Sequence, residues 1–315
     1  LRSMLASADN RFSRPARELY DLLLKPAQSQ LQDKNRLVIV PDGSLWELPM
    51  QALQTSQGRY LIDDHAIFYA PSLTVLREMT KTRDRIGKPS AAPALLALGN
   101  PALGKETVAR VKAVLMDAKL EPLPEAEQQV KALESIYGSD NSTVYVGAEA
   151  REDRFKSDAG EFGILHLATH GVLNDHSPMY SHLLLAQTGK TGKEDGLLEA
   201  RELMQLDLKA DLAVLSACET ARGRVRKGEG MIGLTWALFV AGVPTTVVSQ
   251  WKVRSDSTAE LMVEFHRQLK AGLDGKSARV SVAEALRQAA LKLKRDKKYR
   301  HPFHWAGFGV VGAGY

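Results

Sequence analysis

Two reactive side chains directly follow apolar runs that are typical of buried strands. The run 162–168 leads into Thr169, His170 and Gly171, and the run 212–217 leads into Cys218, the only cysteine among 315 residues. An imidazole within hydrogen-bond reach of a thiol can take its proton and later give a proton to a leaving amine. The thiolate that this produces is the nucleophilic form of cysteine. The residue types therefore predict cysteine hydrolase chemistry if the fold joins the two strand ends.

The spacing agrees with that arrangement. His170 and Cys218 are 48 positions apart, which fits one crossover between neighbouring parallel strands. The carboxyl ends of such strands meet at one edge of the sheet, where α/β proteins place their chemistry. At that edge, the backbone N–H groups of Gly171 and Cys218 are candidates for holding a developing oxyanion. Alone, a cysteine at a strand end is most often a small core residue, and a histidine beside glycine a turn residue. The combination favours a functional site.

Strand and helix patterns alternate along the chain and indicate an α/β fold with a mostly parallel sheet covered by helices on both faces. Expected strands lie at 37–40, 66–70, 94–98, 143–146, 162–168, 212–217, 244–250 and 305–311. Expected helices lie at 125–137, 151–158, 197–206, 229–241, 256–270 and 282–293. The basic, proline-containing segment 81–93 is predicted to be a linker. It divides the chain into residues 1–88 and residues 89–315.

Composition narrows the class of protein. An apolar fraction of 44% and a charged fraction of 25% are those of a globular chain, which excludes collagen-like and wholly disordered proteins. A single cysteine excludes a disulfide framework and any multi-cysteine metal site. Together with the absence of a signal-peptide pattern at residue 1, it favours a reducing, cytoplasmic location. The uncharged stretch 231–251 is long enough for a membrane span, but Pro244 favours a helix followed by a strand, and no membrane association is expected.

Three further motifs have weaker functional interpretations. The G-x-G-x-x-G pattern at 228–233 does not directly follow a strand, so we expect a helix start rather than a dinucleotide site. His166, His170, His176 and His182 could suggest zinc, but their segment is strand-like, and His166 is expected in the core or beside the site. The basic segment 222–227 is expected to be a solvated loop, although it would be the most obvious self-cleavage site of an enzyme that prefers basic residues.

Longer motifs resemble one known family. They are the segment from Ile164 to Gly171, Leu215 to Thr220, Gly228-Glu229-Gly230, Trp251-Lys252-Val253 with Asp256, and His301 to Ala306. These residues resemble the CHAT family, whose domains are caspase-like, related to separase and often fused to tetratricopeptide repeats.

The resemblance implies a caspase-like six-stranded sheet, preceded by a smaller, degenerate caspase-like half. It also implies a cysteine endopeptidase with His170 as base and Cys218 as nucleophile, no cofactor, a protein substrate, and an upstream repeat or sensor domain. Separase-like members hold a basic P1 side chain with an acidic residue. Asp256 lies at that position, and Ser216 and Trp251 are expected beside it in the S1 pocket.

Two other functions remain open from the sequence. One is a catalytically silent caspase-like scaffold for protein–protein signalling, for which the thiol of Cys218 would be inert. The other is a nucleic-acid-linked sensor that uses the basic face at residues 292–300, where the lysines and arginines more often form the solvated side of a helix. The net charge of only +5 does not demand a nucleic acid.

Overall fold

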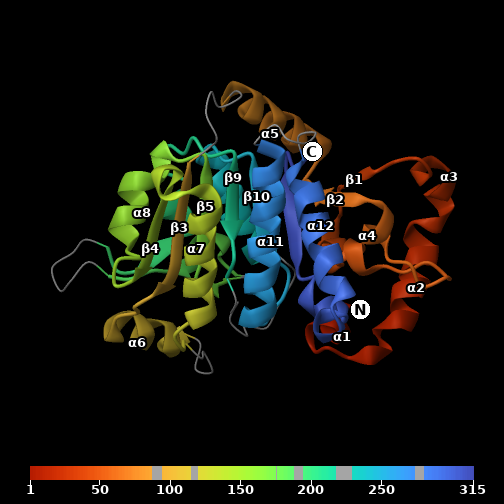
Figure 1. Ribbon diagram of the computed structural model, residues 1–315, viewed down its shortest axis with the longest axis horizontal. Coiled ribbons are helices and arrows are strands. Elements are labelled where there is room, and N and C mark those ends of the chain that lie inside the picture. The colour runs from red at the N-terminus through yellow and green to blue at the C-terminus, as the bar shows by residue number, and fades with distance from the viewer. Residues whose placement is uncertain (87–93, 115–119, 175, 188–193, 218–228, 274–279) are drawn as a thin grey trace.

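The computed structural model describes residues 1–86, 94–114, 120–174, 176–187, 194–217, 229–273 and 280–315 (Figure 1). Cys218 and the basic segment 222–227 lie outside these described residues, as does Gly228. The residues that flank 218–228 define the surroundings of the candidate site.

One sheet of eight strands forms the centre of the molecule, in the order β1-β2-β11-β10-β9-β5-β3-β4 (Figure 1). The strands are β1 (Arg36–Ile39), β2 (Ala66–Tyr69), β3 (Leu95–Pro101), β4 (Ser142–Gly147), β5 (Ile164–Ala168), β9 (Leu212–Leu215), β10 (Thr245–Ser249) and β11 (Phe308–Gly312). Residues after 89 supply six of these strands, in agreement with the expected six-stranded sheet. The N-terminal strands β1 and β2 extend the same sheet.

The sheet is parallel except at one pair. Strands β10 and β11 run antiparallel, while β11, β2 and β1 are parallel to one another. The other five strands, β10, β9, β5, β3 and β4, are also parallel to one another. The sheet thus consists of two parallel groups that point in opposite directions, and the carboxyl ends of β5 and β9 lie on the same edge.

Helices cover both faces of the sheet. On one face lie α7 (Pro124–Tyr137), α11 (Ser255–Leu273) and α12 (Val282–Arg295) (Figure 1). The opposite face packs on α8 (Glu152–Asp158), α9 (Ala200–Leu203) and α10 (Glu229–Val240). The remaining helices are α1 (Arg2–Ala6), α2 (Ser13–Leu23), α3 (Gln28–Leu31), α4 (Leu61–Asp64), α5 (Leu73–Ile86) and α6 (Lys105–Val114).

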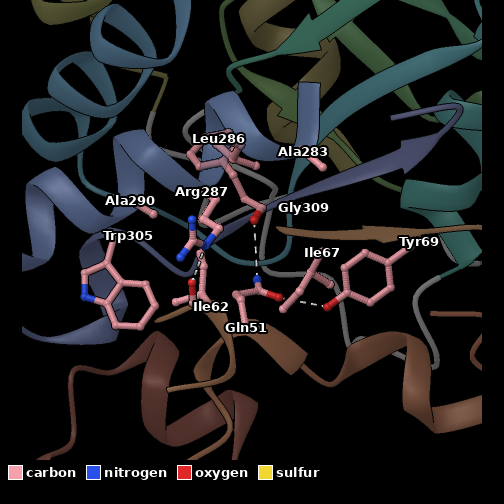
Figure 2. A pocket seen from close by; sticks show the side chains of 11 residues that line it. Gln51, Ile62, Ile67, Tyr69, Ala283, Leu286, Arg287, Ala290, Trp305 and Gly309 are labelled. Atoms are coloured by element: carbon pink, nitrogen blue, oxygen red, sulfur yellow. Dashed lines mark hydrogen bonds between the residues drawn. The ribbon is translucent and has the colours of Figure 1, made fainter. Parts of the chain in front are cut away.

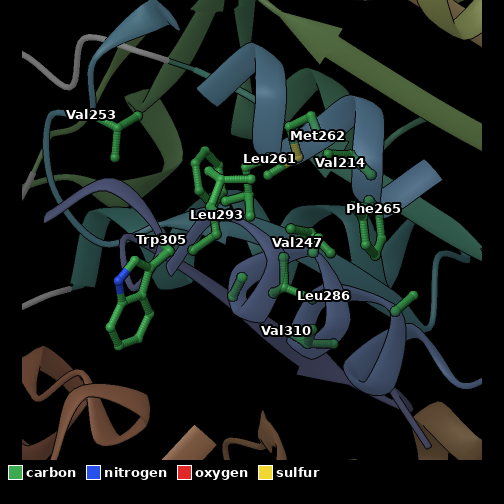
Figure 3. Close-up of a cluster of buried hydrophobic side chains, with 14 of the residues drawn as sticks. Val214, Val247, Val253, Leu261, Met262, Phe265, Leu286, Leu293, Trp305 and Val310 are labelled. Atoms are coloured by element: carbon green, nitrogen blue, oxygen red, sulfur yellow. The ribbon is translucent and has the colours of Figure 1, made fainter. Parts of the chain in front are cut away.

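The alternation of side chains along each strand divides the core into two layers. On β9, Leu212 and Val214 pack under α11 and α12, and Ala213 and Leu215 pack on the opposite side. Figure 3 shows the first layer, in which Phe265 and Leu286 meet Val247 and Val310 of the sheet. Because both faces are buried, these strands are continuous apolar runs rather than alternating ones.

Two expectations about local structure were wrong. Residues 197–206, expected to be one helix, form strand β8 (Leu197–Glu199) followed by the short helix α9. Strand β8 pairs antiparallel with β7 (His182–Leu184), and β7 pairs with β6 (Gly171–Val172), in a small second sheet. The expected linker 81–93 is helical up to Ile86, and residues 87–93 lie outside the described part.

The uncharged stretch 231–251 is divided between α10 and β10, with Pro244 between them. Across the described residues, no helix combines the length and the apolar character needed to cross a bilayer.

Candidate active site

The ends of β5 and β9 adjoin at one edge of the sheet. Their register pairs Ile164 with Leu212 and continues to Leu167 with Leu215. Beyond the paired residues, Gly171 lies against Ala217, since a Cβ atom on Gly171 would be 3.2 Å from the Cβ of Ala217. Ala217 is the residue directly before Cys218. The structure therefore brings the His-Gly pair to the strand end that precedes the only cysteine.

His170 is held by a main-chain carbonyl. Its ring is 2% exposed, and its Nε2 lies 2.8 Å from the carbonyl oxygen of Glu121, just before α7. A carbonyl oxygen can only accept a hydrogen bond, so Nε2 carries the proton. In the neutral imidazole the lone pair is then on Nδ1. Nδ1 is the atom through which His170 can act as a general base.

Ser216 belongs to a chain of buried polar side chains behind the strand ends. Its Oγ accepts a hydrogen bond of 3.1 Å from Nε2 of Gln129 on α7. The same amide nitrogen lies 2.6 Å from Nε2 of His166 on β5. His166 Nδ1 is 3.0 Å from His266 Nε2 on α11, and His266 Nδ1 is 3.0 Å from the Tyr137 hydroxyl. The chain thus connects the strand that leads to Cys218 with α7 and α11.

The hydrogen bonds of this chain have one direction. The amide nitrogen of Gln129 donates to His166 Nε2, so His166 carries its proton on Nδ1 and donates to His266. His266 then donates from its own Nδ1 to the oxygen of Tyr137. Both imidazoles are neutral, because complete burial lowers the pKa of His166 to about 3 and lowers that of His266 well below its ordinary value. His166 thus lies in the core, as the sequence suggested.

The two other predicted S1 residues lie beyond the end of β10. Trp251 is 3% exposed, and its indole N–H donates to the carbonyl oxygen of Phe303 at 3.3 Å. Asp256, in the first turn of α11, accepts a hydrogen bond from Arg254 Nε at 3.0 Å and lies 3.4 Å from Lys298 Nζ. The hydrogen bond from Arg254 is the main reason why the pKa of Asp256 falls to about 2. Asp256 is ionised at neutral pH, but two cations already share its charge.

Other residues that could bind a metal ion already contact polar groups of the protein. His182 Nδ1 is 2.8 Å from the carbonyl oxygen of Tyr180. In the described part of the chain, the carboxylates that could together hold a metal ion are Glu152, Glu194 and Glu202. Lys156 lies among all three, with its Nζ 2.7 Å from Glu152 and 3.0 Å from Glu202. An ammonium group occupies the position that a cation would take.

Three residues around the site were not singled out from the sequence. They are Glu121, Gln129 and His266. Glu121 acts through its main-chain carbonyl, which any residue type supplies, so no sequence signal could reveal it. Gln129 and His266 lie on helices that were expected, but only the packing of α7 and α11 against β5 brings them together.

Comparison with known proteins shows the family of this chain. The family model of the CHAT domain matches residues 13–313. The chain belongs to the CHAT family. Among curated proteins, it is similar to Tetratricopeptide repeat protein 28 of Mus musculus, with 26% identity over 95% of this chain, and to that of Homo sapiens, with 25% identity over 95%. The chain spans 13% of the length of each relative.

Solved structures show that this CHAT domain has a caspase-like fold. The separase of the Saccharomyces cerevisiae separase–securin complex superposes with a TM-score of 0.54 and 13% identity, over 87% of this chain and 15% of that one. The Arg-specific cysteine proteinase gingipain R superposes with a TM-score of 0.54 and 10% identity, over 92% of this chain and 66% of that one. At such identities the likeness concerns the fold alone.

Proposed function

We propose that this CHAT domain is a cysteine endopeptidase in which His170 is the general base and Cys218 the nucleophile. The observation that carries the proposal is the close approach of Gly171 to Ala217, which places a histidine of defined tautomer beside the strand end leading to the only cysteine. The caspase-like fold, which it shares with cysteine proteinases, supports the same chemistry.

The proposed reaction proceeds through a thioester. Nδ1 of His170 takes the proton of the Cys218 thiol, and the sulfur attacks the carbonyl carbon of the scissile peptide bond. The N–H groups of Gly171 and Cys218 hold the negative oxygen of the tetrahedral intermediate. His170 then protonates the departing amine. Water, deprotonated by the same imidazole, hydrolyses the thioester and releases the acid product, which returns the thiol.

Substrate choice is also part of the proposal. Asp256 is ionised, so a basic P1 side chain could replace Arg254 or Lys298 as its partner, with Ser216 and Trp251 nearby. The curated relatives are tetratricopeptide repeat proteins, and we extend this to an upstream repeat or sensor segment that controls the site. A lone thiol nucleophile also requires reducing surroundings, so we propose a cytoplasmic location.

The burial of His170 supports a second candidate. With 2% of its surface exposed, the histidine is accessible to a peptide only after the edge of the sheet opens. This favours either a latent peptidase or a silent scaffold that passes on a signal without chemistry. The two differ in the reactivity of Cys218, because only the peptidase needs a thiolate that depends on His170.

The test compares the wild type with Cys218→Ala and His170→Gln on a peptide library that varies P1. Once the edge of the sheet has opened, we expect cleavage by the wild type only, with a preference for Arg and Lys at P1. A second arm follows alkylation of Cys218 by iodoacetamide from pH 5.5 to 9, which needs no activating partner. We expect alkylation below pH 7 in the wild type and a shift to higher pH in His170→Gln. Identical alkylation profiles would leave the scaffold, and cleavage by Cys218→Ala would refute the mechanism.

A further inference from the structure

We propose that Asn100 is a positioning residue that acts through the carbonyl of Glu121 to fix the tautomer and direction of the His170 ring. The proposal rests on the proposed function only for its catalytic consequence. Asn100 stands in β3, the strand that neighbours β5 on the side away from β9. Asn100 was not predicted as a site residue, because nothing in its type indicates a hydrogen bond to a distant segment.

Both ends of the Asn100 side chain are used. Its Oδ1 accepts the N–H of Leu123 at 2.7 Å, and its Nδ2 donates to Oε2 of Glu127 at 3.0 Å. Leu123 is the residue before α7, and Glu127 lies in the first turn of that helix. Asn100 therefore links the start of α7 to the carboxyl end of β3 through two hydrogen bonds, one that its side chain accepts and one that it donates.

The segment that Asn100 fixes is the one that holds the histidine. Glu121 lies two residues before Leu123, and its carbonyl oxygen receives the Nε2–H of His170. A shift of this segment would lengthen or bend that hydrogen bond. The imidazole would then be free to carry its proton on Nδ1, the tautomer that cannot accept a proton from Cys218. The choice of tautomer by an oriented partner is a common way of keeping a catalytic histidine in its active form.

The backbone supports a dedicated role for this residue. Asn100 has φ +48°, in the left-handed region that few residues other than glycine adopt readily. Asparagine tolerates this conformation better than most other side chains. A glycine at this position would accept the backbone but lose both hydrogen bonds. An asparagine combines the required backbone with the two side-chain groups.

The same helix also contacts the other strand end. Two residues beyond Glu127, Gln129 donates to Ser216 on the strand that leads to Cys218. The segment before α7 therefore positions His170 through Glu121, and α7 itself contacts the strand that leads to Cys218 through Gln129. Anchoring the start of α7 by Asn100 keeps these two contacts in register.

The closing experiment reads the tautomer of His170 directly. In this chain labelled with ¹⁵N-histidine, the ring nitrogen shifts at pH 7.5 report which nitrogen carries the proton, and His170→Gln assigns the signal. We expect a single Nε2–H tautomer in the wild type. In Asn100→Gly, which the backbone accommodates, we expect a mixture of tautomers at His170. A His170 that stays in the Nε2–H form in Asn100→Gly would overturn the proposal.

Exchanging the carboxylate and the amide between positions 100 and 127 tests whether the tautomer can be rescued. Asn100→Asp keeps an acceptor for Leu123 but faces the carboxylate of Glu127, so we expect mixed tautomers again. Adding Glu127→Gln gives the aspartate an amide donor and should restore the single tautomer. If the single and double variants behave alike, the proposed contacts do not set the ring.

The catalytic consequence is measured separately. We expect alkylation of Cys218 at pH 6.5 to slow in Asn100→Gly, because the ring no longer holds its acceptor nitrogen toward the thiol, and to recover in Asn100→Asp/Glu127→Gln. If the tautomer responds to Asn100 while alkylation in the wild type is insensitive to His170→Gln, the positioning role holds and the peptidase fails. If the tautomer does not respond, the positioning role fails whatever the fate of the peptidase.

Discussion

Gly171 lacks a side chain at the point where the ends of β5 and β9 come closest. A Cβ atom at this position would be 3.2 Å from Ala217 and 3.5 Å from Cδ2 of Leu183. The first distance is tighter than an ordinary van der Waals contact. The glycine is therefore explained by space rather than by backbone conformation, and it sets how near the histidine lies to the residue before Cys218.

Gly171→Ala tests that contact at the scale of one methyl group. We expect a loss of about 1–2 kcal/mol in the free energy of unfolding, because an added carbon in a packed site forces its neighbours apart. We also expect slower alkylation of Cys218 at pH 6.5. Urea unfolding measures the first effect and iodoacetamide kinetics the second. The double variant Gly171→Ala/Ala217→Gly returns the space, so both values should recover. Equal defects in the single and double variants would contradict the packing argument.

Site residues could be predicted from the sequence only where the residue type itself indicates a chemical role. His170 and Gly171 could be placed beside the end of β9 because strand ends and spacing are visible in the sequence. The contacts of Asn100, Glu121 and Gln129 depend on where α7 begins relative to β3 and β5, which no local pattern specifies. The bonds of Asp256 to Arg254 and Lys298 were not foreseen for the same reason.

At the scale of elements, α7, α11 and β5 meet through imidazoles rather than through apolar side chains alone. His166 and His266 are fully buried, their ring centroids are 5.0 Å apart, and their environment disfavours the charged form. A proton on either ring would have to enter an apolar layer and would break the one-way order of hydrogen bonds. The packing of these elements should therefore depend on pH.

We expect the two buried histidines to lower the free energy of unfolding as pH falls from 7.5 to 5.5. In the unfolded chain the two histidines gain protons near pH 6.5, whereas the folded pKa of His166 is about 3. The unfolded state therefore binds more protons as pH falls through 6.5, and each histidine lowers the free energy of unfolding by about 1 kcal/mol over this interval. His301 and His304 act in the same direction, since burial lowers the pKa of each.

A variant isolates the contribution of the pair. His266→Gln keeps groups that can accept from His166 and donate to Tyr137, but it does not titrate. Urea unfolding at pH 7.5 and 5.5 should show that this variant loses less stability than the wild type, by about 1 kcal/mol. The comparison variant is His65→Gln, at a half-buried histidine outside this chain of hydrogen bonds. An unchanged loss in His266→Gln would mean that the buried ring is charged in the folded protein.

Most expected elements were confirmed, and the helix expected at 197–206 shows where local patterns fail. Strands such as β3 and β9 were evident because burial on both faces leaves uninterrupted apolar runs. Residues 197–206 have the apolar spacing of a helix, yet Leu197–Glu199 pair with β7. This pairing joins two parts of the chain between β5 and β9, in the small second sheet. Such short tertiary partners are invisible to local periodicity.

At the scale of the whole molecule, Gln51 connects the N-terminal strands to the rest of the sheet. Its Nε2 donates to the carbonyl oxygen of Ala306 at 2.7 Å and to Gln250 Oε1 at 3.1 Å. Its own Oε1 accepts from the hydroxyl of Tyr69 on β2 at 2.8 Å. Figure 2 shows Gln51 between Tyr69 and Gly309 of β11. One buried amide thus joins residues before and after the expected division at residue 88.

Gln51→Leu should destabilise residues 1–88 and residues 89–315 together. We expect a loss of about 2 kcal/mol, because the substitution leaves buried polar partners unsatisfied. Hydrogen exchange followed by mass spectrometry should show that the amides of β2 and β9 lose protection by the same factor. Gln32→Leu, at an exposed position, is the matched control and should retain wild-type protection. A loss confined to β2 would show that residues 1–88 open as a separate unit.

The reversal of strand direction at β10 and β11 separates the two ends of the chain. Helix α1 lies at the edge of the sheet where β10 ends, and there Arg2 donates to the carbonyl oxygen of Gln250 at 2.8 and 3.1 Å (Figure 1). The other end lies at the opposite rim, where Tyr315 bonds to Thr80 of α5 at 2.7 Å. A domain fused before Leu1 would therefore act on the backbone next to the sheet edge of the proposed site. A domain fused after Tyr315 would attach at the opposite edge.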